Sequence, residues 1–554
     1  MILSFIKETL KMAKPFSGLK FLLFPLLFPN LLAAQEVGLD EQINDAFMPI
    51  ATAWENLVLT PVPIGSYNVP LVLILLVIGA SFFTLYFKFP SITQFITAIQ
   101  TVRGKYDSVD HHESGNPDLS VAGDVIGTLK DESQTGEVSH FQALATAVSG
   151  TVGLGNIAGV AVAIALGGPG ATFWMIVCGL IGMATKFVEC TLGVAYRDVD
   201  ENGIVYGGPM YYLSKGLKEI GYSKLGIILG YVFAILCVGA SFGGGNAFQS
   251  NQAAVQISTL FGLQGGAVGF LIGLCLAALV GVVIIGGIKR IASITEKIVP
   301  FMAGIYVFAS LVIIFSNFSY IDEAIGLILK GAFTPMAGIG GVMGVLIVGF
   351  QRAAFSNEAG AGSAAIAHAA VKTRYSASEG VVALLEPFID TVLICTMTAL
   401  VIIFFNIDGS NVQSIFTYGG DGSNVILNAN NQSIGGVDLT SMAFDSVLPG
   451  FSYVLTLAIV LFAFSTMISW SYYGLQSWKF LFGKGKTADL IYKILFLLFV
   501  VIGSAATLDA VIKFSDAMIL ALVFPNMIGL LFLFPKVKLA LNEYLNAIKN
   551  LKEK

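Results

Sequence analysis

Apolar stretches of about 20 residues recur along this chain, separated by shorter polar segments. Each stretch is continuous rather than alternating, and each can cross the roughly 30 Å hydrocarbon core of a bilayer as a helix. Because no water satisfies the backbone inside lipid, such a stretch predicts a helix that makes its own hydrogen bonds. We therefore predict an all-α membrane protein of eleven transmembrane helices, which start near Pro70, His140, Ala171, Leu225, Ala267, Ile298, Ile339, Gly380, Gly450, Leu490 and Lys513.

The composition agrees with this prediction. Apolar residues make up 56% of the 554 residues and charged residues only 12%, whereas a soluble domain carries about twice that charged share. The cysteines lie inside apolar stretches without metal-ligand spacing, which predicts small buried hydrophobic residues rather than a disulfide or metal framework. They are Cys178, Cys190, Cys237, Cys275 and Cys395. We expect neither a cofactor nor a nucleic-acid partner.

The first 34 residues have the order of a secretory signal. Four lysines precede a short apolar stretch at 21–32, and Ala33 and Ala34 follow it. We interpret residues 1–34 as a signal peptide or leader. Leu32 stands at the usual small position before cleavage, so an uncleaved interfacial segment is the alternative.

Positive charge divides the connections into two groups. Segments 35–69 and 405–449 contain neither Lys nor Arg. The cations occupy alternate connections, at Lys88, Arg103, Lys105 and Lys130; Arg197, Lys215, Lys218 and Lys224; Lys289, Arg290 and Lys297; Lys372 and Arg374; Lys479, Lys484 and Lys486; and from Lys536 onward. Since positive connections stay cytoplasmic, the mature N-terminus is predicted to be periplasmic and the C-terminus cytoplasmic, in the inner membrane.

An odd number of spans with these orientations predicts two halves of opposed topology. The first span is extra, and the other ten divide into two sets of five, as in many secondary transporters. The predicted organisation is a periplasmic segment at 35–69, the extra helix at 70–88, a cytoplasmic loop at 89–138, a first five-helix repeat at 139–317, a second at 338–541 and a cytoplasmic tail at 542–554.

The first helix of each half is interrupted at matching positions, 149–156 and 355–363, by glycines and polar residues. Each Gly costs roughly 1 kcal/mol relative to Ala inside a helix, so local unwinding is easy there. The freed amides and carbonyls then need partners, which a bound substrate or ion supplies. The alternative interpretation is that the glycines only allow helices to pack closely.

Two further helices contribute polar side chains at membrane depth. The third helix of the first half carries Asn246, Gln249, Gln252 and Gln256, whose spacing predicts one polar face. We expect Gln249 to lie nearest the centre, although hydrogen bonds between helices would explain the amides equally well. The third helix of the second half carries Ser465, Thr466, Ser469 and Trp470. Its hydroxyls suit a small alkali cation, or bond back to the preceding turn.

Ionisable residues inside the apolar stretches need an explanation, because each costs at least about 2.5 kcal/mol in mid-bilayer. Lys186, Glu189, Glu386 and Asp390 are expected to snorkel or to form pairs near helix ends. Arg352 and Glu358 flank the second interruption, where they either form a structural pair with each other or control access.

The sequence contains no complete motif of the enzyme classes that we considered. Residues 483–487 resemble the end of a phosphate-binding loop, but Phe480 replaces the first glycine. Neither HExxH nor GxSxG occurs in the sequence, so we expect no enzyme.

At these residues the chain resembles the alanine or glycine:cation symporter family. The resemblance runs from about Pro70 to Pro535 and is carried by 153–159, 167–175 and 355–365, of which 167–175 looks like the family signature. It implies the leucine-transporter type of inverted repeat with one extra N-terminal helix. It also implies sodium-driven uptake of alanine or glycine, with Na⁺ as the coupling ion, by a protein that we expect to be monomeric.

The same resemblance implies a site. Na⁺ would meet the carbonyls of Ser149 and Val152 and the hydroxyls of Ser465 and Thr466. The substrate would be bound by Thr151, Gly153, Gly155, Asn156, Gln249, Ser356, Asn357, Gly360, Gly362 and Trp470. Proton coupling through Glu358 is the main alternative, and a passive channel or an amino-acid sensor is less favoured.

Overall fold

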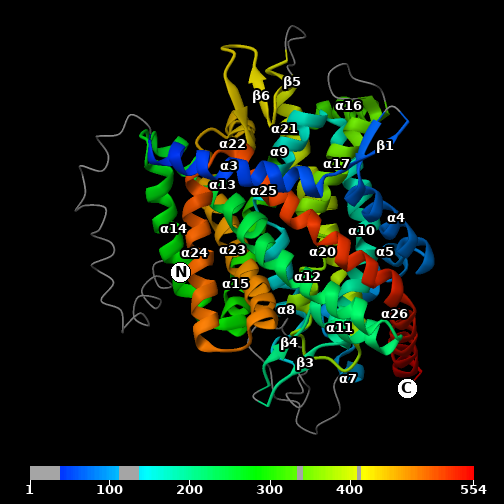
Figure 1. Ribbon diagram of the computed structural model, residues 1–554. Helices are drawn as coiled ribbons and strands as arrows, with labels where there is room; N and C mark the ends of the chain where they lie inside the picture. The colour runs from blue at the N-terminus through cyan, green and yellow to red at the C-terminus, as the bar shows by residue number, and fades with distance from the viewer. Residues whose placement is uncertain are drawn as a thin grey trace.

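The computed structural model describes residues 38–65, 67–110, 136–201, 203–333, 341–407 and 414–553, and they form a largely helical bundle (Figure 1). The predicted leader at 1–34 lies outside the described residues, as does 111–135 within the predicted cytoplasmic loop.

The helices up to the middle of the chain are α3 (Leu39–Val58), α4 (Leu71–Tyr86), α5 (Pro90–Thr93), α6 (Phe95–Val102), α7 (Asp107–Asp110), α8 (His140–Thr151), α9 (Ala158–Gly167), α10 (Gly170–Ala195), α11 (Pro209–Glu219), α12 (Ser223–Phe242), α13 (Phe248–Phe261), α14 (Val268–Ile284), α15 (Gly287–Ser316) and α16 (Ile321–Phe333). The later helices are α17 (Gly341–Asn357), α18 (Ala364–His368), α19 (Ser376–Ala383), α20 (Leu385–Pro387), α21 (Thr396–Asn406), α22 (Gly436–Val447), α23 (Ser452–Phe482), α24 (Lys486–Ala505), α25 (Leu508–Ala521) and α26 (Val523–Lys552). Two π-helical segments, Gly243–Ala247 and Phe388–Cys395, join α12 to α13 and α20 to α21.

Several of these helices are long and apolar enough to cross a membrane. Seven described helices or helix runs qualify individually, and the pair α8 and α9 qualifies as one span bent by 55°. Two shorter apolar helices, α4 and α14, lie where the sequence predicts spans. These features show a helical multi-pass membrane protein, whereas the total of eleven spans stays a prediction.

The predicted starts of the spans agree with the structure to within about five residues, with one exception. The span expected near Ile298 belongs to α15, which begins eleven residues earlier, at Gly287. The prediction was wrong because a helix does not need to end where the lipid ends. The first turns of α15 carry Lys289, Arg290 and Lys297 and continue the helix beyond the apolar stretch.

The connections without cations are structured. In 405–449, strands β5 (Phe416–Asp421), β6 (Asn424–Leu427) and β7 (Ser433–Gly435) form an antiparallel sheet in which Val425 pairs with Ile434, and α22 follows. In 35–69, α3 lies across the bundle (Figure 1), and the short strands β1 (Pro61–Ile64) and β2 (Tyr67–Pro70) form a hairpin.

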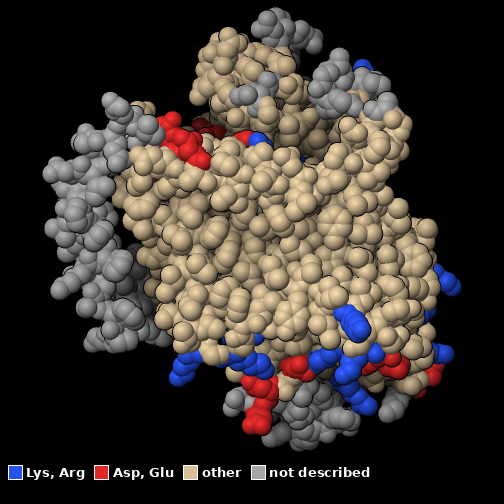
Figure 2. Space-filling view, viewed as in Figure 1, with Lys and Arg blue, Asp and Glu red and all other residues tan. Residues whose placement is uncertain are grey.

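Charge divides the surface along the long direction of the bundle. Figure 2 shows most Lys and Arg gathered at one end, near β3 (Asp198–Val199), β4 (Val205–Tyr206) and the end of α26. The broad middle of this face carries almost no charge. We call this end, at β3, β4 and the end of α26, the basic end.

Candidate functional site

The first interruption follows α8, whose start is fixed by a capping box between Ser139 and Gln142. Beyond Thr151 the helix opens, and the amide of Gly153 donates to the side-chain Oδ1 of Asn156 at 2.9 Å. The next amide, of Leu154, donates to Oε1 of Gln249 at 3.0 Å. Side-chain amides thus replace helical carbonyls as partners of the unwound backbone, which explains the break's stability inside a buried region.

The second interruption follows α17 and rests on left-handed backbone. Glu358, Gly360 and Gly362 have φ values of 56°, 95° and 82°. A side chain is poorly tolerated at such φ values, so the glycines permit the turn and Glu358 is held in it by its surroundings. The amide of Ala359 donates to Oδ1 of Asn357 at 2.9 Å, as the amide of Gly153 does to Asn156 in the first break.

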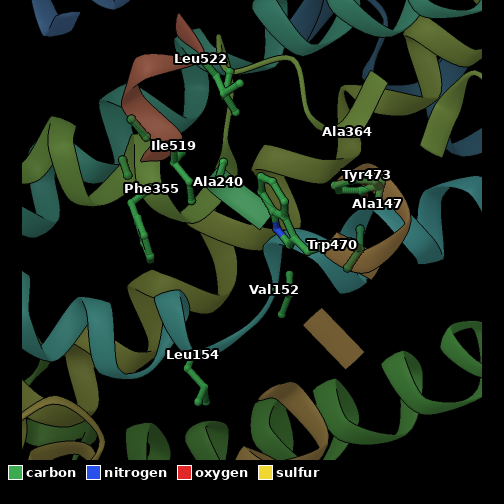
Figure 3. Packing of buried hydrophobic residues seen from close by; sticks show 14 of the residues in the cluster. Ala147, Val152, Leu154, Ala240, Phe355, Ala364, Trp470, Tyr473, Ile519 and Leu522 are labelled. Carbon is green, nitrogen blue, oxygen red and sulfur yellow. The ribbon is translucent and has the colours of Figure 1, made fainter. Parts of the chain in front are cut away.

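The two breaks lie against each other, as is necessary if residues of both bind the substrate. A Cβ atom on Gly155 would lie 3.5 Å from the ring of Phe355 and 3.7 Å from the Cα of Ser356. Figure 3 shows Val152, Leu154, Phe355 and Trp470 around the same region between the helices.

Gln249, Thr466 and Trp470 also reach the first break. A Cβ on Gly153 would lie 2.4 Å from Oγ1 of Thr466 and 3.0 Å from Oε1 of Gln249. The indole Nε1 of Trp470 donates to the carbonyl of Gly150 at 3.2 Å and to Oε1 of Glu358 at 3.1 Å. One tryptophan therefore bridges residues from both breaks.

The amides of the polar stripe do not all face this region. Asn246 lies in the π-helical turn and donates to the carbonyl of Phe496 on α24 at 2.6 Å. Farther along α13, Gln252 accepts from the amide of Val437, and Gln256 donates to Thr456. The π-helical turn shifts Asn246 out of the register that the 3.6-residue spacing assumes, whereas Gln252 and Gln256 lie farther along α13. Gln249 is therefore the amide that meets the break.

Hydroxyls and carbonyls connect α8 to α23. Ser149 Oγ donates to the carbonyl of Ser465, and Thr466 Oγ1 donates to the carbonyl of Ser149, both at 2.9 Å. Ser465 Oγ bonds back to the carbonyl of Phe462, as the sequence-based alternative proposes, but Thr466 does not. Val152 is fully buried beside them.

One of the two alternatives for Arg352 and Glu358, a structural pair with each other, is wrong. Arg352 forms a buried ion pair with Asp516 on α25, and Gln351 donates to the same carboxylate at 3.0 Å. Glu358 instead accepts from Ser363 and from Trp470. Arg352 thus points to α25, whereas the left-handed turn at Glu358 lets that carboxylate meet Trp470 of α23.

Of the two alternatives for the acids and the lysine within the apolar stretches, snorkelling is wrong and pairing is confirmed for Lys186 and Glu386. Lys186 and Glu386 form an ion pair of 3.1 Å in which both side chains are completely buried. Glu189 accepts from the amide of Gly360 and from Asn526, each at 2.8 Å. Glu189 therefore stabilises the second break through Gly360, and Lys186 is paired with Glu386 in the buried interior.

Sequence reasoning missed a buried cluster that adjoins this ion pair. Glu379 accepts hydrogen bonds or ion pairs from His140 at the start of α8 and from His368 in α18. His368 also lies 3.4 Å from Glu386. The only sequence signal was the occurrence of acids and histidines within apolar stretches, which says nothing about their partners.

Asp390 was noted in the sequence but not assigned to the site. The structure places it, fully buried, between the two breaks, where it accepts from Asn156 at 2.8 Å and from Ser356 at 2.7 Å. All the residues predicted to bind substrate or Na⁺ are buried as well. Their amides, hydroxyls and carbonyls suit the binding of a small zwitterion and an alkali cation.

A family model, the sodium:alanine symporter family, matches residues 57–554. The chain belongs to this family. Among its relatives, the sodium/alanine symporter AgcS of Methanococcus maripaludis is 42% identical over 406 residues, 73% of this chain and 83% of AgcS. The putative sodium/proton-dependent alanine carrier protein YrbD of Bacillus subtilis is 36% identical over 425 residues, 76% of this chain and 84% of YrbD. The probable sodium/glutamine symporter GlnT of B. subtilis is 36% identical over 410 residues, 74% of this chain and 78% of GlnT.

Membership of the sodium:alanine symporter family fits the geometry. The protein is a cation-coupled amino-acid symporter and not an enzyme. The resemblance found in the sequence is therefore confirmed at the level of the family.

Proposed function

We propose that this protein imports alanine or glycine together with Na⁺. The observation that carries the proposal is the position of Gly153, where the first break meets both the hydroxyl of Thr466 and the amide of Gln249. One unwound segment thus adjoins groups suited to a cation and groups suited to an amino acid.

The Na⁺ site in this proposal lies between α8 and α23. In a regular helix the amide of Gly153 would donate to the carbonyl of Ser149. Here that amide donates to the carbonyl of Thr151 and to Oδ1 of Asn156, so the carbonyl of Ser149 accepts from the hydroxyl of Thr466 instead. Carbonyls of Ser149 and Val152 with hydroxyls of Ser465 and Thr466 give hard oxygen ligands. An incoming Na⁺ would replace the contact between Thr466 and Ser149.

The substrate site would be formed by the two breaks, with Thr151, Gly153, Gly155 and Asn156 on one side. On the other side stand Ser356, Asn357, Gly360 and Gly362, and Gln249 and Trp470 complete the set. The carboxylate would meet the amides of the first break and the ammonium would meet Gln249 and the second break. Phe355 and Trp470 are bulky side chains beside the breaks, and we expect them to leave little room beyond a methyl group, which favours alanine and glycine.

The free energy of Na⁺ entry is sufficient to drive the accumulation of an amino acid. One Na⁺ that enters across 100 mV releases about 2.3 kcal/mol, and a tenfold sodium gradient adds about 1.4 kcal/mol. With one Na⁺ per substrate, these sum to an accumulation of several hundredfold. The buried pair of Arg352 and Asp516 joins α17 to α25 and is proposed to control access to the site.

The remaining features of the proposal follow the sequence analysis. The eleven spans form five-plus-five inverted repeats after one extra helix, in the inner membrane, with the basic end cytoplasmic. The mature N-terminus is then periplasmic, and the protein works as a monomer by alternating access.

Uptake of labelled alanine into proteoliposomes tests the function. An inward Na⁺ gradient should drive accumulation, and collapse of that gradient should abolish it. Equal accumulation driven by a proton gradient in sodium-free buffer would overturn sodium coupling and favour the proton alternative, in which Glu358 carries the proton. Uptake without accumulation would indicate a channel.

A further inference from the structure

Asp390 and Thr391 lie side by side in the π-helical segment Phe388–Cys395, and both are completely buried. This segment packs between the two breaks. Single π-helical turns inside α-helices are rare and occur frequently at functional sites.

Each break contains an asparagine that plays the same part. Oδ1 of Asn156 accepts from the amide of Gly153, and its Nδ2 donates to Asp390 at 2.8 Å. In the second break, Oδ1 of Asn357 accepts from the amide of Ala359, and its Nδ2 donates to the hydroxyl of Thr391 at 2.9 Å.

Asp390 and Thr391, which anchor the two asparagines, are also joined to each other. Thr391 Oγ1 donates to Oδ1 of Asp390 at 2.6 Å, and Ser356 of the second break donates to the same oxygen at 2.7 Å. A continuous set of hydrogen bonds therefore runs from the amide of Gly153, through Asn156, Asp390 and Thr391, to Asn357 and the second break. Such chains polarise each member, and loss of one member leaves its buried neighbours without partners.

We propose that Asp390 and Thr391 are positioning residues that hold the two breaks in one arrangement. The inference rests on the proposed function, because the breaks are where alanine and Na⁺ would bind. Through Asn156 the pair fixes the amide of Gly153, which adjoins Thr466. Through Asn357 it fixes the second break. Na⁺ bound at the first break then favours the arrangement of the second break that alanine requires, and each ligand strengthens the other.

Thr391→Val tests this link with little change of shape. The methyl group of Thr391 packs against Gly179 of α10, where an added Cβ would lie 3.2 Å from it. Valine keeps this methyl group and replaces only the hydroxyl. Thr391→Ser keeps the hydroxyl. Thr396→Val is the matched control, since the hydroxyl of Thr396 is buried on the same stretch and makes no hydrogen bond in the described part of the chain.

The measurement is the alanine Kd of purified protein at low and at saturating Na⁺, whose ratio reports the coupling. Thr391→Val should reduce this ratio about tenfold, whereas Thr391→Ser and Thr396→Val keep the wild-type ratio. Should Thr391→Val fold poorly, Asp390→Asn keeps the shape of the side chain, removes the acceptor that meets Nδ2 of Asn156, and should shift the ratio in the same direction. A wild-type ratio in Thr391→Val, or an equal defect in Thr391→Ser, would overturn the inference.

Hydrogen exchange without ligand provides a readout that does not need transport. In Thr391→Val, backbone amides of 150–157 and of 355–363 should both exchange faster, and in Thr396→Val neither should. Faster exchange in the second break alone would overturn the inference. If the wild-type protein binds no alanine, the proposed function fails while this comparison still decides whether the anchor joins the breaks.

Discussion

At Gly153, a single added carbon atom should impair transport much more than it impairs folding. A Cβ there would lie 2.4 Å from Oγ1 of Thr466 and 3.0 Å from Oε1 of Gln249. Real Cβ contacts are essentially never that short, so Gly153→Ala must displace the hydroxyl of Thr466, the amide of Gln249 or both. The hydroxyl of Thr466 bonds to the carbonyl of Ser149, and Gln249 accepts from the amide of Leu154. Both the proposed Na⁺ site and the proposed substrate site therefore change.

The expected size of the effect follows from the packing. An overpacked site costs about 1–3 kcal/mol, which corresponds to roughly a 5- to 150-fold weaker apparent affinity. Because the displaced groups lie at the site, the loss should fall on Na⁺ and alanine dependence more than on stability. We would measure sodium-driven alanine uptake at varied alanine and Na⁺ in proteoliposomes, with the melting temperature of the same preparations.

Gly159→Ala is the matched control. Gly159 is buried in α9 six residues away, yet a Cβ there would meet no heavy atom within 4 Å. Alanine also stabilises a helix relative to glycine, so Gly159→Ala should transport normally. Wild-type transport by Gly153→Ala, or an equal loss in both variants, would refute the placement of the site at the first break.

Three further outcomes are expected. Gln249→Ala should weaken alanine binding about tenfold without unfolding the protein, and leucine should not compete for uptake; normal affinity or strong competition would make Gln249 a structural amide. Cysteines at Asn428 and Lys484 should react with an impermeant thiol reagent from opposite sides of the membrane, and same-side labelling would contradict the proposed topology. Removal of one partner of the buried Arg352 and Asp516 pair should destabilise the protein by about 3–5 kcal/mol; stability is measured by unfolding, and a loss below 1 kcal/mol would show that the pair is weak.

Much of the fold could be predicted because lipid imposes a simple rule on the sequence. Continuous apolar stretches give the helices, and the glycine-rich breaks are local signals that the structure reproduces at 152–157 and 358–363. The start of α15 was missed because charged turns continue a helix into water as readily as apolar turns continue it in lipid. Register also failed at Asn246, where a π-helical turn alters the spacing.

The hydrogen-bond partners of the buried polar groups could not be predicted from the sequence, for a different reason. Asn156 and Asp390 are 234 residues apart in the sequence, and His140 and Glu379 are 239 apart. Which acid meets which base depends on the packing of several helices at once. Composition indicates only that such groups must be paired, so the pairing of Arg352 with Asp516 could not be distinguished from a pairing with Glu358.

The distribution of these buried contacts bears on how the site opens toward the basic end. Helices α8 and α18, one from each broken helix, are joined through Glu379, which bonds to His140 and His368, and by a backbone bridge between Val138 and Val371. Contacts with charged groups are costly to break when buried, at about 3–5 kcal/mol each.

The other side of α8 is held more weakly. Thr146 meets Thr295 of α15 at 3.3 Å, and Ser149 exchanges hydrogen bonds with Ser465 and Thr466 of α23. These bonds join neutral groups and contribute about 1 kcal/mol each. Bonds to carboxylates also occur here, from Gln142 to Glu296 on α15 and from Trp470 of α23 to Glu358 beside α18. Since an interface parts where its contacts cost least, we expect α8 and α18 to move together, away from α15 and α23, when the site opens toward the basic end.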